Sequence, residues 1–162
     1  METNCSKVAS RGFFEIGIFH GKTEVNIGTL WRSAFQLGAA GIFTIGRRYT
    51  TQSSDTVKTA RHIPLRNYST VHELIEALPD SCPLIGIEMG GPRLEHFSHP
   101  PRACYLLGAE DHGLPDSVLQ LCHRTVSIGS MRTASFNVAV AGSLVMYDRM
   151  VKLNPTTPEN IP

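Results

Sequence analysis

An apolar run that stops abruptly at a glycine-rich loop constrains the fold of this chain more than any other feature. Residues Ala103 to Leu107 are apolar throughout, and the loop from Gly108 to Gly113 (GAEDHG) follows at once. A buried parallel strand that delivers its carboxyl end to a ligand has this pattern. A helix is predicted to start next, because Pro115 suits a first helical turn, where an N–H has no intrahelical partner.

A second strand and loop follow farther along the chain. Residues 125–128 are predicted to form an apolar strand that ends in the loop 129–135, and a helix is predicted from about Phe136 to Met150. Two strand ends and a helix start therefore converge within a short stretch, and we expect the active site there.

The remaining strands are predicted from short runs rich in aromatic and β-branched residues that end at turn residues. These runs cover residues 12–20, 39–46, 63–65 and 83–88. Helices are predicted over residues 54–60 and 70–78, the second with a capping box between Thr70 and Glu73. The alternation favours an α/β fold, a mostly parallel sheet flanked by helices.

The first predicted helix has the clearest periodicity. Apolar residues from Ile27 to Phe35 recur with the spacing of one helical stripe. Asn26 precedes the stripe as a natural N-cap, and Gly38 ends the helix. Arg32 lies at the border between this stripe and the polar face.

The last helix has almost no polar face. From Val138 to Met146 nearly every residue is apolar or small, and polar side chains return only at Asp148 and Arg149. A helix that is apolar all round must be covered on every side. Gly142 costs about 1 kcal/mol relative to alanine and is normally tolerated where another backbone comes close. Both features predict contact with a partner subunit.

Length and composition bound the class of protein. The chain has 162 residues, a formal net charge of +1 and 41% hydrophobic residues. These values fit one domain over residues 1–153, followed by a proline-rich, loosely ordered tail at 154–162. No apolar run approaches the ~20 residues that span a bilayer, and no secretion signal is present. We therefore expect a cytoplasmic protein with no membrane contact.

No metal site is predicted. The cysteines are scattered without a Cys-x-x-Cys pair and are expected to be reduced. His96 and His99 could share a metal, but no third ligand is suggested by spacing, so a solvated loop is the favoured interpretation of LEHFSHPP.

The near-neutral charge excludes a large, uniformly basic surface but not a local one. Basic residues gather within a short stretch, at Arg47, Arg48, Lys58, Arg61 and Arg66. Such a cluster can bind a phosphate backbone, and a solvated loop and helix face can have the same composition.

Three segments together resemble the SpoU, or TrmH-like, branch of the SPOUT superfamily of RNA methyltransferases. Residues 26–38 (NIGTLWRSAFQLG) resemble N-x-G-x-x-x-R-x-A-x-x-x-G, and residues 106–115 (LLGAEDHGLP) resemble L-G-x-E-x-x-G-L. Residues 135–141 (SFNVAVA) resemble S-L-N-V-S-x-A, with Phe136 in place of the usual leucine and Ala139 in place of the common serine. The similarity is greatest to minimal, single-domain members that modify tRNA.

This resemblance implies a C-terminal trefoil knot, which periodicity does not indicate because threaded chains are rare. It implies that loops of the knot bind S-adenosyl-L-methionine, that S-adenosyl-L-homocysteine is the product, and that no metal is needed. It also implies a homodimer formed partly through the first and last helices. The implied activity is methyl transfer to a ribose 2′-hydroxyl of RNA, with tRNA favoured over rRNA.

Arg32 matches the family's catalytic arginine; without the motif, a solvated or helix-pairing arginine would be the default. Free arginine has a pKa above ~12 and is a poor base. We therefore expect Arg32 to bind an RNA phosphate and polarise the hydroxyl, with that phosphate sharing in proton removal.

The other catalytic candidates each have a structural alternative. Asn26 either caps its helix or orients Arg32 or the RNA. Glu110 is either an exposed loop carboxylate or a residue that positions substrate and braces the loops. Ser135 and Asn137 lie at the entrance to the last helix, where Ser135 could cap it and either side chain could face the substrate or Arg32.

The cofactor's adenosine is expected to rest on backbone groups and small side chains at three strand ends. Glycine permits close backbone approach, and aliphatic walls suit adenine. The cofactor candidates are Gly86, Ile87, Glu88, Leu107, Gly108, Gly113, Ile128 and Asn137. His112 has a suitable pKa for a general base, but the motif has no fixed histidine there, so a loop role is favoured.

Two nucleotide-binding classes do not fit. A Rossmann fingerprint requires G-x-G-x-x-G directly after the first strand, where this chain has HGKT at 20–23, and a P-loop would need a glycine at Ile16. A non-catalytic RNA-binding protein on this fold would be expected to have lost Arg32 or the glycine loops. The resemblance therefore implies a tRNA ribose 2′-O-methyltransferase, with rRNA methylation or a non-catalytic RNA-binding protein as the alternative.

Overall fold

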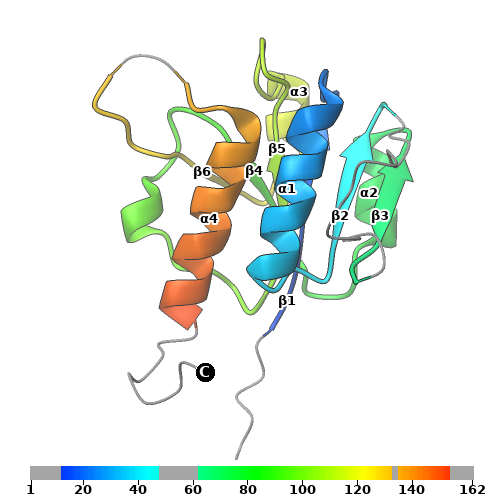
Figure 1. Ribbon diagram of the computed structural model, residues 1–162, viewed down its shortest axis with the longest axis horizontal. Coiled ribbons are helices and arrows are strands. Elements are labelled where there is room, and N and C mark those ends of the chain that lie inside the picture. Colours follow the sequence, from blue (N-terminus) through cyan, green and yellow to red (C-terminus); the bar gives the residue numbers. More distant parts are fainter. Residues whose placement is uncertain (1–11, 48–61, 133–134, 154–162) are drawn as a thin grey trace, which may run out of the picture.

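Six parallel strands form a sheet in the middle of the molecule (Figure 1). The computed structural model describes residues 12–47, 62–132 and 135–153. The strands are β1 (Phe13–Phe19), β2 (Gly41–Ile45), β3 (Leu65–Tyr68), β4 (Leu84–Ile87), β5 (Arg102–Leu107) and β6 (Arg124–Val126). They are hydrogen-bonded in the order β3-β2-β1-β5-β4-β6. The predicted α/β fold with a parallel sheet is confirmed.

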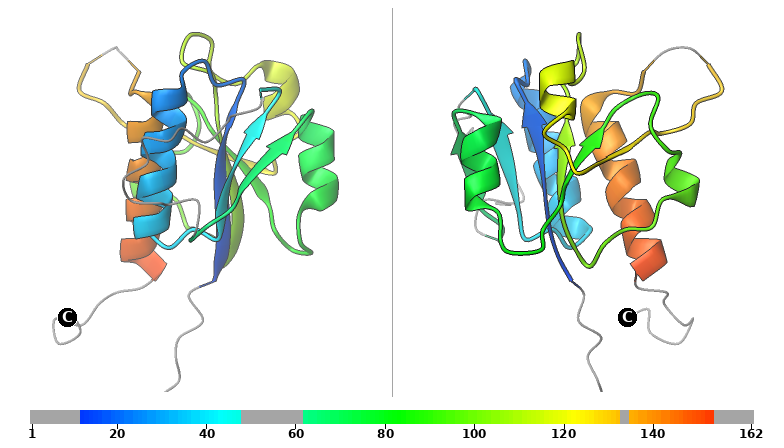
Figure 2. Two further views of the ribbon diagram at one scale, coloured as in Figure 1. Left: turned by 45° about the vertical axis from the view of Figure 1, so that its right-hand side comes forward. Right: turned by 180° about the vertical axis from the view of Figure 1, so that it is seen from behind.

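Helices cover both faces of this sheet (Figure 2). Helices α1 (Glu24–Gln36) and α4 (Val138–Leu153) lie side by side on one face, while α2 (Val71–Ala77) and α3 (Asp116–Leu119) lie on the other. A 3-10 turn, η2 (Leu94–His96), contacts α4. None of the helices in the described ranges is long and apolar enough to cross a membrane.

Strand β5 shows why both faces need a cover. Ala103, Tyr105 and Leu107 belong to the core under α1 and α4, whereas Cys104 and Leu106 belong to the core under α2 and α3. All five are buried, because side chains alternate between the two faces of a strand. A continuous apolar run is therefore what a central parallel strand requires.

Helix α1 starts earlier than its apolar stripe suggested. Its N-cap is Thr23, and Asn26 is the third helical residue, so the prediction of an N-cap at Asn26 is wrong. The physical reason is that the Asn26 side chain bonds to two other side chains instead of to the backbone of its own helix. The stripe itself is confirmed, with four of its residues buried: Ile27, Leu30, Trp31 and Ala34. Gly38, at φ +85°, ends the helix as predicted.

Helix α4 begins at Val138, not at Phe136. The side-chain oxygen of Asn137 accepts hydrogen bonds from the N–H groups of Ala139 (2.9 Å) and Val140 (3.3 Å), as an N-cap does. Ser135 is exposed and makes no such bond, so the capping role offered for it falls to Asn137.

Gly142 is explained within the chain. A Cβ at this position would collide with Leu30 of α1 and would crowd Leu107 and Ile16 of the sheet. The missing side chain therefore lets α4 pack closely on its own domain. The inference of a partner subunit from Gly142 is wrong, and the case for a partner depends on the outer face of α4 instead.

The lower end of α4 holds a buried polar cluster that the sequence did not indicate. Arg149 is 2% exposed, and it donates to the carbonyl oxygens of Pro100 (2.6 Å) and Pro101 (2.7 Å). The ring of His99 lies 2.6 Å from the hydroxyl of Tyr105 and 2.8 Å from the carboxylate of Asp148. The interpretation of LEHFSHPP as a solvated loop is therefore wrong at His99, which is buried.

Other boundaries differ by a few residues. Strand β3 covers Leu65–Tyr68 and not 63–65, because it is residues 65–68 that pair with β2. The capping box of α2 is confirmed, since Thr70 Oγ1 accepts from the N–H of Glu73 at 3.2 Å. The predicted helix at 54–60 and the tail at 154–162 lie outside the described residues.

Candidate active site

A cavity of about 480 Å³ opens at the carboxyl ends of β4, β5 and β6. Its size is within the range of small-molecule sites. Three segments and the start of α4 line it: the ends of the strands, the loop 108–113, and residues from both sides of the connection into α4. The predicted site residues among its walls are Ile87, Glu88, Leu107, Gly108, Glu110, Gly113, Ile128, Ser135 and Asn137.

Two glycines let the loop 108–113 close tightly. A Cβ on Gly108 would collide with the backbone of Gly113 and with the N–H of Leu114. Gly113 has φ +62°, and a Cβ there would collide with the carboxylate of Glu88. These two glycines therefore let the loop pack closely on itself and on Glu88, and their contact with a cofactor stays a prediction.

Glu88 joins two of the strand ends. One carboxylate oxygen accepts from the N–H of Leu114 at 2.7 Å, and the other accepts from the N–H of Met89 at 2.9 Å. The carboxylate thus holds the end of β4 against the glycine loop while its side chain lines the cavity. Its position supports a role for Glu88 in bracing the glycine loop, in addition to the predicted contact with the cofactor.

A chain of hydrogen bonds connects the three sequence motifs at the upper edge of the cavity. Asn26 donates to Glu110 Oε1 at 2.8 Å, and Asn137 donates to Asn26 Oδ1 at 2.9 Å. The three residues come from α1, the loop after β5 and the start of α4, and are separated by up to 111 positions in sequence. We call this the Asn26–Glu110–Asn137 chain.

Glu110 receives further donors from the segment before α1. The N–H of Lys22 lies 3.1 Å from one carboxylate oxygen, and the Thr23 hydroxyl lies 3.3 Å from the other. Burial raises the pKa of Glu110, but the hydrogen bonds from Asn26, Lys22 and Thr23 outweigh it and hold the pKa below its ordinary value. Glu110 is therefore a charged acceptor at neutral pH and not a free loop carboxylate.

Arg32 and Gly86 lie outside the lining of the cavity. Arg32 is exposed on α1, and among the described residues it makes no hydrogen bond or ion pair. Gly86 is buried within β4, where a Cβ would crowd Cys122, Leu114 and Leu119 on the α3 side. Gly86 therefore serves packing in this chain, and a direct contact with a ligand in the cavity is not supported.

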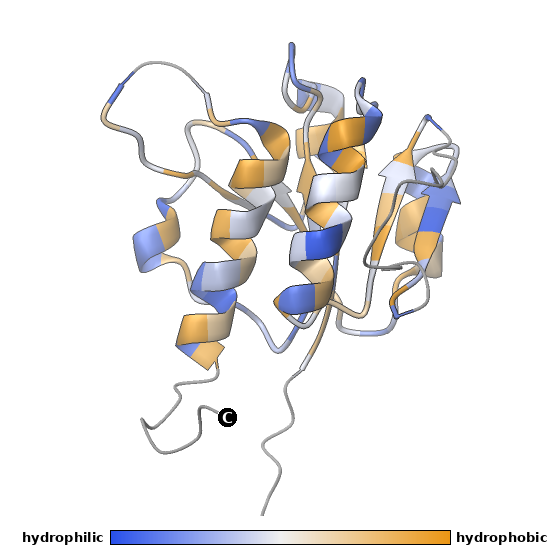
Figure 3. Ribbon diagram, viewed as in Figure 1, coloured by the Kyte–Doolittle hydropathy of each residue, from blue (hydrophilic) through white to orange (hydrophobic). Residues whose placement is uncertain are grey.

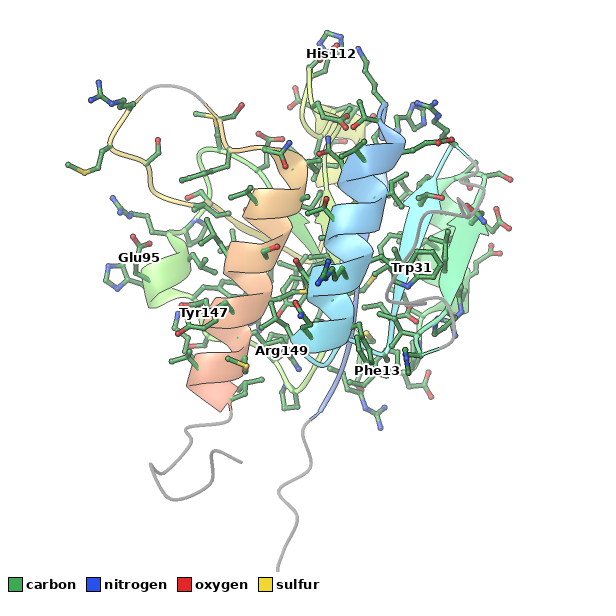
Figure 4. The ribbon with its side chains drawn as sticks, in the orientation of Figure 1. Phe13, Trp31, Glu95, His112, Tyr147 and Arg149 are labelled. Atoms are coloured by element: carbon green, nitrogen blue, oxygen red, sulfur yellow. The ribbon has the colours of Figure 1, made fainter. Side chains whose placement is uncertain are left out.

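Several lining residues were not among the predicted ones. They are Met89, Ala109, Asp111, His112, Ser130, Phe136, Val138 and Ala141. Figure 4 shows His112 at the tip of the loop after β5, where it is exposed. Most of these residues are direct neighbours of predicted ones, so each predicted loop, taken whole, would have included them. Lys22, which forms an ion pair with Asp111, had no signal in the sequence.

The cluster of basic residues is only partly described. Arg66 of β3 forms an ion pair across β2 with Glu15 of β1, and Arg47 is exposed at the end of β2. Arg48, Lys58 and Arg61 lie outside the described residues. Within the described ranges no group of histidine, cysteine and carboxylate side chains could hold a metal ion.

Comparison with known proteins assigns this arrangement to a family. The sequence profile described as the SpoU rRNA methylase family matches residues 15–147, which is most of the chain. The chain belongs to the SpoU rRNA methylase family. The predicted family is thereby confirmed, and the matched range includes all three motifs. The trefoil knot stays a prediction.

One curated relative is an uncharacterized tRNA/rRNA methyltransferase from Archaeoglobus fulgidus. It is 27% identical over 147 residues, which cover 87% of this chain and 66% of the relative. The chain therefore spans slightly less than two thirds of that protein's length.

Solved structures share the fold of this SpoU family member. A structure described as giving insights into the 2-OH methylation of C/U34 on tRNA has a TM-score of 0.78 and 23% identity, and the match covers 90% of this chain and 99% of that one. The SpoU methyltransferase AviRb from Streptomyces viridochromogenes, in complex with AdoMet, has a TM-score of 0.76 and 23% identity, covering 86% and 57%. At these identities the likeness shows the fold.

Proposed function

We propose that this SpoU family member is an S-adenosyl-L-methionine-dependent RNA methyltransferase that acts on a ribose 2′-hydroxyl. The observation that carries the proposal is the Asn26–Glu110–Asn137 chain, which ties the three motifs together at the rim of one cavity. A reaction that joins a small donor to a large acceptor needs such a cavity next to an open surface.

The walls of the cavity suit the donor. Ile87, Leu107 and Ile128 offer aliphatic surface for an adenine ring, and Gly108 and Gly113 let the loop that forms one wall of the cavity close tightly. When bound, the donor supplies an activated methyl group on a cationic sulfur. AviRb, with its bound AdoMet, has the same fold and supports this choice of cofactor.

The Asn26–Glu110–Asn137 chain would orient the reacting groups, and Arg32 would polarise the acceptor hydroxyl. The main demand of an in-line methyl transfer is alignment of donor and acceptor, which can contribute about 7–11 kcal/mol. The Asn26–Glu110–Asn137 chain would fix the start of α4 against α1 and the glycine loop. Arg32 would bind the RNA phosphate next to the acceptor hydroxyl, as a fixed cation and not as a base.

Arg32 would reach the reaction from a partner subunit. It is exposed on α1, which lies beside α4 on the same face of the sheet (Figure 2). Along α4 the residues Val140, Leu144, Tyr147 and Val151 recur at helical spacing and are 46%, 37%, 57% and 49% exposed. Figure 3 shows hydrophobic residues along α4, and Figure 4 shows Tyr147 on its outside. A homodimer through α1 and α4 would cover this stripe.

Transfer RNA is the favoured substrate, with rRNA as the alternative. The similarity to the structure that concerns C/U34 of tRNA covers nearly all of both chains, whereas the match to AviRb covers 57% of that protein. A non-catalytic RNA-binding protein is disfavoured because Arg32 and both loop glycines are present.

Methyl transfer from labelled S-adenosyl-L-methionine to RNA tests the proposal. The acceptors would be separate tRNA and rRNA fractions from cells that lack the protein, with nucleoside analysis of the product. We expect a 2′-O-methylated nucleoside from the tRNA fraction. Label in a base would contradict ribose methylation, label in rRNA alone would select the alternative substrate, and no label in either would favour the non-catalytic reading.

A further inference from the structure

Two stacked rings stand at the carboxyl end of β1, outside the cavity. The rings of Phe19 and His20 have centroids 4.1 Å apart and an interplanar angle of 15°. Phe19 is half-buried against the core under α2 and α3, whereas His20 is exposed. Phe19 covers one face of the imidazole, and His20 as a whole stays accessible to solvent.

The backbone around His20 is built for this position. His20 has φ +51°, an uncommon value for a residue other than glycine, and its N–H donates to the carbonyl of Ile45 at 2.9 Å. Gly46 follows with φ +78°, and a Cβ there would collide with the imidazole ring. The end of β2 thus leaves room for the imidazole, and His20 keeps an uncommon backbone conformation in this position.

Arg47 adds positive charge beside the rings. Its guanidinium donates to the carbonyl oxygens of Gly21, at 3.2 Å, and of Lys22. Carbonyl groups do not neutralise its charge, and Arg47 has no carboxylate partner within the described ranges. The guanidinium is therefore fixed on the two residues that directly follow the exposed His20.

The same segment leads directly to the proposed active site. Lys22, whose carbonyl receives Arg47, bonds through its own N–H to Glu110 at 3.1 Å and pairs with Asp111. Both acidic residues line the cavity. The rings and Arg47 therefore lie on the carboxyl edge of the sheet, on the β1–β2 side of the site.

We propose that Phe19, His20 and Arg47 form a second RNA-binding surface, which stacks an unpaired base on His20 and holds an adjacent phosphate with Arg47. This inference rests on the proposed function for its substrate class. An exposed aromatic face next to a fixed guanidinium has the chemistry by which proteins bind unstacked nucleotides. The base bound here belongs to a nucleotide other than the methylated one, because the rings are not part of the cavity's lining.

Binding of fluorescein-labelled bulk tRNA, measured by anisotropy, tests this surface. His20→Asn removes the aromatic face, and asparagine tolerates the left-handed backbone, so the fold is kept. We expect its Kd for tRNA to rise roughly 10-fold, whereas His20→Tyr should stay within about 2-fold of the wild type. Arg47→Ala should weaken binding and lower the slope of log Kd against log salt by about 1.

Matched controls lie away from this edge. His72→Asn changes an exposed histidine on α2, and Arg124→Ala removes an exposed arginine at the amino end of β6. Both should bind tRNA like the wild type, and His20→Asn should keep the wild-type affinity for S-adenosyl-L-methionine. Equal tRNA affinity of His20→Asn and the wild type, or no binding of tRNA by the wild type, would overturn the surface. Methyl transfer that fails while these binding differences persist would instead count against the proposed function alone.

Discussion

Glu110 is the residue on which the three motifs converge. It accepts from Asn26 of the first motif and from the backbone of Lys22, and Asn26 in turn accepts from Asn137 of the third motif. A single carboxylate thus holds the glycine loop, the start of α1 and the start of α4 together. Hydrogen bonds to a charged group contribute more than neutral ones, about 1.5–3 kcal/mol each before coupling is considered.

Glu110→Gln should therefore weaken both stability and catalysis. A glutamine turns an NH₂ group toward donors, so we expect a loss of about 1–3 kcal/mol in the free energy of unfolding and roughly 100-fold in kcat. Since the pKa of Glu110 is lowered on folding, its contribution is present above the ordinary carboxyl pKa and is lost as the pH falls through the folded value. Urea denaturation near neutral pH measures the change.

The matched control for Glu110 is Glu95→Gln. Glu95 pairs with Arg93 on the surface, where the two side chains are 52% and 62% exposed. Exposed pairs contribute little, so this variant should unfold at the same urea concentration as the wild type. Equal effects of the two substitutions would mean that Glu110 does not brace the site.

Arg32→Ala should abolish methyl transfer. Arg32 is exposed and lies outside the cavity, so the affinity for S-adenosyl-L-methionine should be unchanged. Single-turnover transfer and calorimetric titration separate the two properties. Arg124→Ala serves as the control, and an Arg32→Ala variant that turns over like the wild type would refute the assigned role.

At this scale the sequence identified the residues but not their partners. The motifs selected Asn26, Glu110 and Asn137, yet a spacing of 111 positions between two of them gives no hint that they share a hydrogen bond. The local pattern favours an N-cap role for Asn26. In the fold the Asn26 side chain bonds to Glu110 and Asn137 instead, because these distant residues are stronger partners.

Helix α4 is the element that joins the site to the opposite end of the molecule. Asn137 caps its start at the cavity, and Arg149 and Lys152 bind carbonyl groups of residues 94–101 near its end. His99 lies in that lower cluster, facing Tyr105, Asp148, Arg149 and Lys152. Burial lowers the pKa of His99, and this effect outweighs the opposing influence of Asp148.

Acidification should loosen this end of α4. A histidine whose pKa is lowered on folding binds its proton more readily when unfolded, so its contribution is complete above about pH 6.5 and is lost as the pH falls below that value. The urea concentration at the unfolding midpoint of the wild type should therefore decrease when the pH is lowered from about 7.5 to about 5.5. His99→Gln should flatten this dependence, and the exposed-site variant His72→Gln should not. Parallel pH profiles for all three proteins would exclude His99 as the cause.

At the scale of elements, periodicity correctly predicted features that depend on residues close in sequence. The stripe of α1 and the capping box of α2 were correct because both depend on residues near in sequence. The partner contact predicted from Gly142 and the solvated loop predicted at His99 were wrong because the neighbours of these residues come from other elements. Leu30 and Leu107 surround the glycine, and Asp148 contacts the histidine. Local sequence does not predict which distant residues will be in contact in the fold.

At the scale of the whole molecule, the carboxyl edge of the sheet carries two separate features. On the β4–β5–β6 side the edge forms the cavity, and on the β1–β2 side it carries the rings and Arg47. The fold class and the place of the site followed from the alternation of strands and glycine loops, because parallel strands end at one edge. The strand order could not be read, since nothing in an isolated strand specifies its neighbour.

The proposed homodimer predicts the effect of a charge on the outside of α4. Leu144→Glu places a carboxylate in the apolar stripe that includes Tyr147 and Val151, and should convert a dimer into a monomer. Light scattering measures the mass. Methyl transfer should decrease as the dimer is lost, because Arg32 is then absent from the partner's site. His72→Glu, on the opposite face of the sheet, should stay dimeric. A wild type that scatters as a monomer would remove the proposal.

Calorimetric titration with S-adenosyl-L-methionine tests the account most directly. The wild type should bind one molecule per chain. Gly108→Val should not bind it, since a side chain at Gly108 collides with the backbone of Gly113 and displaces the loop that lines the cavity. No heat from the wild type, or the same affinity in Gly108→Val, would contradict the placing of the donor in this cavity.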